Sequence, residues 1–92
     1  MRSVQSGTPI NLSATGVISE ASGALLGFYV NSTSSGTIVL NTGGAAGATS
    51  GGTAISGTIT PAIGWHPYPV ETPNRMYATL GATINVTFVF AS

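Results

Sequence analysis

Residues 76–90 read MYATLGATINVTFVF, and this stretch decides the fold class. In its second half, large apolar side chains occupy every second position, at Ile84, Val86, Phe88 and Phe90. A period of two places side chains of one kind on one face of a β-strand. The first half alternates in the same way, and Gly81-Ala82 separates the two halves. Glycine at the first central position suits a type II′ turn, so the stretch predicts a β-hairpin.

Other short runs of strand-forming residues lie upstream, separated by glycine and proline. Residues 24–31 and 37–40 flank a serine-rich segment, which predicts a second hairpin. Gly27 inside the first run indicates a bulge or the close approach of another backbone. Residues 14–19 and 53–60 predict two further strands. Between these runs, residues 41–52 are almost entirely small or polar and predict a mobile loop.

These runs predict an all-β fold. No long window carries a helical period of 3.6 residues, and helix-forming residues are scarce. We expect one small antiparallel β-sandwich of six to eight short strands with jelly-roll-like connections, formed by residues 13–92. Residues 1–12 are polar and broken by a proline, and we expect them to form an N-terminal arm that orders on a neighbouring subunit.

One proline-rich segment differs from the rest. Residues 64–70 contain Pro67 and Pro69, which cannot donate a backbone hydrogen bond and therefore predict an edge strand or an extended surface segment. The segment also carries large amphipathic side chains of the type enriched at interfaces. The candidate interface residues of the chain are Trp65, His66, Tyr68, Arg75 and Tyr77.

Composition favours assembly over a free monomer. Charged residues make up 4% of the chain, against roughly 25% in an ordinary domain. A chain of 92 residues has a small core, and it contains no cysteine that could form a disulfide. Few charges also mean little repulsion between copies, so we expect neighbouring subunits to cover much of the surface. The alternative is a monomer kept in solution by its many hydroxyl and amide groups.

The residues needed for catalysis or cofactor binding are largely missing. The only two carboxylates, Glu20 and Glu71, lie in contexts that do not suggest a catalytic pair, and aspartate is absent. His66 is the single histidine, it lies between Trp65 and a proline, and no nucleophile elbow accompanies it. The sequence therefore predicts a protein with no catalytic residues, no cofactor and no metal site.

Nucleic acid and membrane are also not expected as partners. The glycine-rich residues 42–47 are not followed by the lysine of a phosphate loop, because the chain contains no lysine. Two arginines cannot neutralise enough phosphates to hold a nucleic-acid backbone. The longest apolar run is far too short to span a bilayer, and the first residues lack the apolar run of a signal peptide. We expect synthesis as a soluble cytoplasmic product.

Three stretches resemble a pattern found in small virion proteins of tailed bacteriophages. They are ALLGFYVNSTSSGTIVL at residues 24–40, GTITPAIGWHPYP at residues 57–69 and MYATLGATINVTF at residues 76–88. In that group the turn within the last stretch reads Leu-Gly-Gly-Thr, whereas this chain has Ala82 in place of the second glycine. The resemblance covers roughly residues 15–90. It implies a small β-sandwich on a phage head or tail.

Several proteins of this group look like capsid decoration, or cement, proteins. The resemblance implies a virion location, the major capsid protein and further copies of this chain as partners, and a trimeric arrangement on the head. The alternative is a tail, fibre or head–tail attachment module that contacts glycans on the host surface. A secreted sugar- or ice-binding module is a third reading, and the lack of a regular threonine repeat argues against it.

Overall fold

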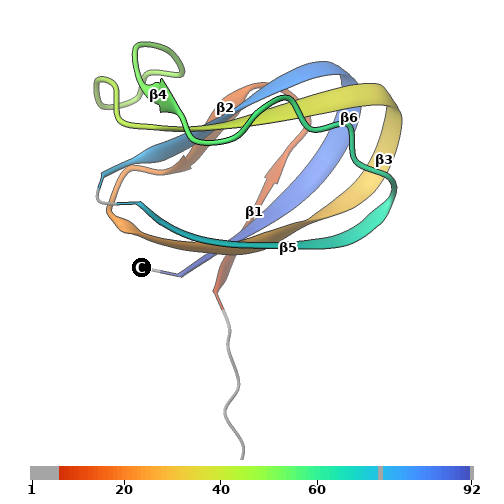
Figure 1. Cartoon of the computed structure of the whole chain (residues 1–92), viewed down its shortest axis with the longest axis horizontal. Coiled ribbons are helices and arrows are strands. Elements are labelled where there is room, and N and C mark those ends of the chain that lie inside the picture. The colour runs from red at the N-terminus through yellow and green to blue at the C-terminus, as the bar shows by residue number, and fades with distance from the viewer. Residues whose placement is uncertain (1–6, 73, 92) are drawn as a thin grey trace, which may run out of the picture.

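The computed structural model of the chain describes residues 7–72 and 74–91, and every regular element in them is a β-strand (Figure 1). The prediction of an all-β, antiparallel fold is confirmed. Six strands form one sheet: β1 (Thr8–Leu12), β2 (Gly16–Ser19), β3 (Gly23–Thr42), β4 (Thr53–Ala54), β5 (Gly64–Thr72) and β6 (Met76–Ala91).

Two long strands organise the sheet. β3 has 20 residues and β6 has 16, and they pair with each other in antiparallel register from Ala24↔Ala91 to Thr42↔Met76. Both curve from one layer of the molecule into the other, so the single sheet folds over on itself (Figure 1). The lower layer in this view has the order β1-β6-β3-β5, and the upper layer has β2-β6-β3-β4. Two separate sheets with jelly-roll connections are not confirmed.

Both predicted hairpins are wrong, because each proposed turn is a bend inside a continuous strand. The predicted turns at residues 32–36 and at Gly81-Ala82 face each other, with Ser34 opposite Thr83 and Thr37 opposite Gly81. A shift of register lies between Ser34 and Thr37, where Ser35 has a φ of 57°, and Ala82 has a φ of 55°. Such bulges bend a strand and increase its twist, so the paired strands turn together into the second layer.

The core lies between the two layers and is apolar. Twelve buried residues form it: Ile18, Leu25, Phe28, Val30, Ile38, Leu40, Met76, Ala78, Ile84, Val86, Phe88 and Phe90. The alternation predicted for the last strand is confirmed, since all four of its large apolar side chains point inward. Period-two alternation in residues 24–31 predicts Leu26, Phe28 and Val30 on one face and Leu25 and Tyr29 on the other. For Leu25 and Leu26 this prediction is wrong. A bulge between Leu25 and Gly27 shifts the register, and Leu25 is the residue in the core.

The predictions for the remaining segments are confirmed in part. The early strand predicted at residues 14–19 is β2, and the strand predicted at residues 53–60 is reduced to β4 and a single bridge between Ile59 and Ile38. Thr8–Leu12, within the expected N-terminal arm, forms β1 and pairs with Val86–Phe90 of β6. The arm's residues 1–6 lie outside the described residues.

Candidate functional site

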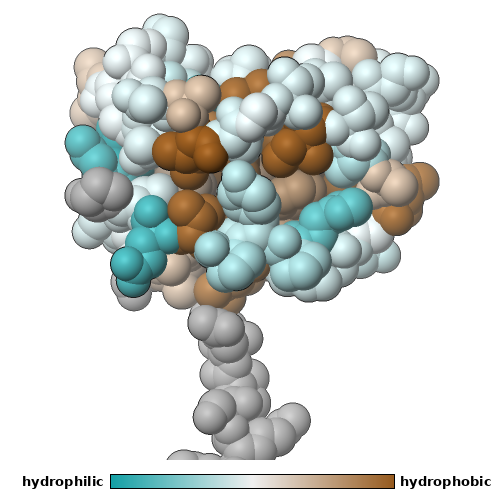
Figure 2. Space-filling view, in the orientation of Figure 1, coloured by the Kyte–Doolittle hydropathy of each residue, from teal (hydrophilic) through white to brown (hydrophobic). Residues whose placement is uncertain are grey.

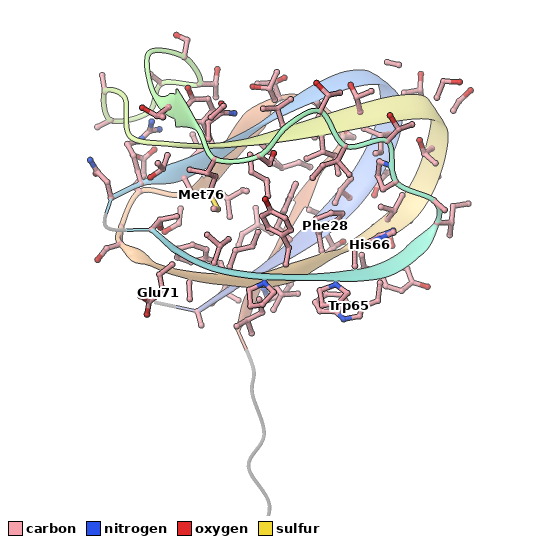
Figure 3. The ribbon with its side chains drawn as sticks, viewed as in Figure 1. Phe28, Trp65, His66, Glu71 and Met76 are labelled. Carbon is pink, nitrogen blue, oxygen red and sulfur yellow. The ribbon has the colours of Figure 1, made fainter. Side chains whose placement is uncertain are left out.

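β5 presents alternate side chains to solvent and to the interior. Trp65, Pro67, Pro69 and Glu71 are exposed, and the residues between them are partly buried. Figure 3 shows Trp65 and Glu71 on the outer side of β5, while His66 points between the layers toward Phe28. β5 pairs with β3 and with no other strand among the described residues, so the prediction of an edge strand is confirmed. The exposed face of β5 is the candidate site.

Trp65 lies across the outer face of the neighbouring strand. A Cβ atom added at Gly27 of β3 would lie 2.7 Å from Trp65 Cζ2 and 2.5 Å from the His66 carbonyl oxygen. Only glycine therefore allows the indole to pack this closely on β3, as the sequence indicated for Gly27. Trp65 nevertheless remains 49% exposed. One part of the ring is held against the sheet, and the rest is open to a ligand.

The register places a second aromatic residue beside Trp65. Tyr29 of β3 is the pairing partner of Trp65 and is 46% exposed. On the other side of Tyr29 lies Thr87 of β6, which is paired in turn with Asn11 of β1. These four residues form one row across the lower layer, on its outer face. We call Trp65, Tyr29, Thr87 and Asn11, together with the adjacent Asn31 and Asn85, the aromatic–amide row.

Hydrogen bonds fix the amide end of this row. Asn11 Nδ2 donates to Asn85 Oδ1 at 2.9 Å and to Thr87 Oγ1 at 3.1 Å. Asn31 Nδ2 donates to the same two oxygens, at 3.0 Å each. Asn11 Nδ2 also lies 3.2 Å from the Val86 carbonyl oxygen. Three amides from three strands are thus oriented by one another before any ligand binds.

His66 and Tyr68 have structural contacts on the inner side of β5. His66 Nε2 lies 2.7 Å from the Ala62 carbonyl oxygen, and its ring stacks on Phe28 with 5.3 Å between the ring centroids. The Tyr68 hydroxyl donates to the Ile55 carbonyl oxygen at 3.4 Å. These contacts join β5 to the preceding segment and to the core. Trp65 is the member of this group that is most available to a partner.

Arg75 and Tyr77 were predicted as interface residues, but both are 3% exposed. Arg75 Nε donates to Glu20 Oε1 at 2.8 Å, and its two terminal nitrogens donate to the carbonyl oxygens of Gly43 and Ala48. The Tyr77 hydroxyl accepts a hydrogen bond from the Gly52 amide at 3.0 Å. Both side chains therefore hold the glycine-rich loop, and we do not retain them as contact residues.

We expect the Glu20–Arg75 pair to make the stability of the fold sensitive to acid. Hydrogen bonds from Arg75, and then from the Gly47 amide, hold the pKa of the Glu20 carboxyl below its ordinary value of 4.5. A group with a lowered pKa stabilises the fold above its unfolded pKa, and this contribution is lost as the pH falls through the folded value.

We therefore expect the melting temperature to fall as the pH is lowered from about 5 to about 2. Thermal unfolding followed by circular dichroism measures this change. The Glu20→Gln variant is expected to melt lower at neutral pH and to show a smaller drop in acid. An equally steep drop in the variant would contradict the assignment of acid sensitivity to Glu20.

The rest of the described surface is almost without charge. Once Glu20 and Arg75 pair with each other, Glu71 is the one charged side chain outside an ion pair in residues 7–72 and 74–91. In Figure 2 most of the visible face is pale, with strongly apolar and strongly hydrophilic residues in small separate groups. Apart from Glu71, the exposed face of β5 that forms the candidate site carries only uncharged side chains.

The described residues offer little for catalysis. Both carboxylate oxygens of Glu20 accept hydrogen bonds from Arg75 and Gly47, which suits a structural anion rather than a proton carrier. Within residues 7–72 and 74–91, no three histidine, cysteine, aspartate or glutamate side chains lie close enough to hold a metal ion. The same residues contain no helical segment with the length and apolar character needed to cross a membrane.

Comparison of the chain with protein-family models, with curated proteins and with solved structures found no match. The site must therefore be interpreted from its own chemistry. Sequence reasoning identified Trp65 but did not assign Tyr29 to a site. Asn11, Asn31 and Asn85 each begin an Asn-x-Ser/Thr sequon, and in so serine- and threonine-rich a chain these matches were interpreted as chance. The alternation of residues 24–31 already predicted that Tyr29 faces away from Phe28. No sequence pattern indicated that residues 11, 31 and 85 meet on one face.

Proposed function

We propose that this chain is a non-enzymatic structural protein of a tailed-bacteriophage virion, and that it decorates the head by binding between capsid subunits. The observation that carries the proposal is the neutral surface: among the described residues, one charged side chain lies outside an ion pair. A neutral surface lacks the repulsion that keeps soluble proteins apart, and it loses little free energy of charge desolvation when a neighbour covers it. The resemblance of three sequence stretches to small phage virion proteins is the reason for proposing that the assembly is a phage particle.

The architecture suits a mechanical role. β3 and β6 are paired along nearly their whole length and both continue from one layer into the other, so two strands joined by a ladder of backbone hydrogen bonds connect the layers at the bend. Strand addition at β5 is disfavoured, because Pro67 and Pro69 offer no donor to an added strand. We infer that this protein meets its capsid partner through side-chain surfaces rather than through the edge of β5.

Mass spectrometry of the purified virion tests the proposal. We expect the chain to be present in hundreds of copies per particle and to remain bound through density-gradient purification. Particles made without it are expected to assemble and then to lose their DNA at a lower temperature than wild-type particles. A handful of copies would instead support the alternative, a tail, fibre or head–tail attachment module. Absence from the particle would contradict both.

A further inference from the structure

The aromatic–amide row has the chemistry of a carbohydrate-binding surface. The outer faces of sugar rings carry polarised C–H groups that pack on the negative faces of aromatic rings. Trp65 and Tyr29 offer two such rings at paired positions, and each is about half exposed. The indole of Trp65 is already held against β3 at Gly27, so little side-chain entropy is lost when a ligand covers it. Aromatic rings that serve only to pack the core are buried, whereas about half of each of these two residues is exposed.

The amide end of the row provides the polar half of such a site. Asn31 and Asn11 use their Nδ2 atoms for bonds to Asn85 and Thr87. Their Oδ1 atoms and Asn85 Nδ2 make no side-chain hydrogen bond within residues 7–72 and 74–91. Two acceptors and one donor, oriented by the surrounding network, can bind neighbouring hydroxyl groups of a sugar. The row crosses four strands, about 14 Å at ordinary strand spacing, which fits a short oligosaccharide better than a single sugar.

The charge of the face selects for neutral ligands. Glu71 lies on the same outer side of β5 as Trp65 (Figure 3), and Arg75 is buried on another part of the fold. Glu71 is six residues from Trp65 along β5, about 20 Å at the ordinary rise of a strand, so it does not contact the row. An anionic sugar bound at the row would find no described cationic side chain on this face to pair with. We propose that the aromatic–amide row binds a neutral glycan chain, with Trp65 and Tyr29 stacking on sugar rings and the three asparagines binding hydroxyl groups.

This inference goes beyond the proposed decoration role, and either can fail without the other. A subunit attached to the head through a different face would leave the row exposed on the particle, where it could hold the virion to surface polysaccharide of the host. If the row is instead covered by the capsid, Trp65 is a protein contact, as the sequence analysis expected of an interface residue. A glycan and the capsid protein are thus the two alternative occupants of the row, and substitutions in the row would affect sugar binding in the first case and attachment to the particle in the second.

Trp65 is the only tryptophan of the chain, so its fluorescence reports directly on the row. We would titrate the full chain with neutral hexasaccharides of glucose in α-1,4 and β-1,4 linkage, mannose, galactose and N-acetylglucosamine. At least one is expected to give a saturable change in Trp65 emission. Tyr29→Ala and Asn31→Ala are each expected to weaken binding about tenfold, the effect of losing one stacking or paired hydrogen-bond contact.

Two controls separate stacking from general stickiness. Tyr29→Phe keeps the ring and is expected to bind as the wild type does, and Ile63→Ala removes an apolar side chain that is 63% exposed but lies outside the row. Circular dichroism verifies that each variant folds. Isothermal titration extends the comparison to Trp65→Ala, which lacks the reporter and is expected to lose binding.

The particle gives the deciding result. Trp65→Ala is expected to enter the virion at the wild-type copy number, measured by mass spectrometry. Binding to none of the hexasaccharides would overturn the inference, as would equal weakening by Ile63→Ala and Tyr29→Ala. Loss of Trp65→Ala from the particle without any sugar binding would assign the row to a protein contact and leave the decoration role intact.

Discussion

Replacement of Phe88 by alanine is expected to lower the free energy of unfolding by about 3–5 kcal/mol. Phe88 is fully buried in the C-terminal part of β6, and its ring centroid lies 5.9 Å from that of Phe28, its partner on β3. On the other side it is paired with Ile10 of β1. The substitution therefore leaves a cavity where three strands meet, and the paired strands hold that cavity open. Chemical denaturation followed by circular dichroism measures the change.

The size of the domain makes this effect large. A small domain has a total stability of about 5–15 kcal/mol, so the loss could leave much of the protein unfolded at growth temperature. Thr83→Ala is the matched control, because Thr83 is exposed on the same strand and its loss is expected to change stability by less than about 0.5 kcal/mol. If Phe88→Ala were as stable as Thr83→Ala, the inward face of β6 would not be the core.

Much of the fold could be predicted from short-range sequence patterns. The period of two in residues 83–90 is a property of one strand, so it correctly identified the inward face whatever the strand paired with. The turns could not be predicted from such short-range patterns. Glycine next to a small residue permits both a reversal of the chain and a bend within a strand, and the local sequence does not distinguish them. The pairing partner decides between a reversal and a bend, because each long strand pairs with the other long strand and does not fold back on itself.

The candidate site likewise has one part that local sequence predicted and another part that it did not. Trp65 and the edge position of β5 followed from local features, an exposed aromatic beside two prolines. The amide end of the row depends on pairing between residues separated by 54 to 76 positions, and no pattern within one segment contains that register. Arg75 was predicted as an interface residue, and it is buried. Its burial depends on Glu20 and on the loop carbonyls that it meets only in the folded chain.

Replacement of Gly36 by alanine tests the bend directly. A Cβ atom at Gly36 would lie 2.5 Å from the Cβ of Ile84 and 2.9 Å from the Thr83 carbonyl oxygen, both on the opposing strand. Neither atom is the end of a flexible side chain, so β3 and β6 must move apart where they turn together. Overpacking of this kind typically costs about 1–3 kcal/mol. We expect a loss in that range, measured by chemical denaturation.

Gly57→Ala is the matched control for this substitution, because a Cβ atom at Gly57 has nothing within 4 Å. The control is expected to be neutral or to stabilise the protein by up to about 1 kcal/mol, since alanine restricts the unfolded chain. A hairpin at residues 32–36 would remove this difference between the two variants, because its turn would tolerate alanine without contact to Ile84. A Gly36→Ala variant as stable as Gly57→Ala would therefore contradict the continuous, bent β3 on which the paired rows of both layers depend.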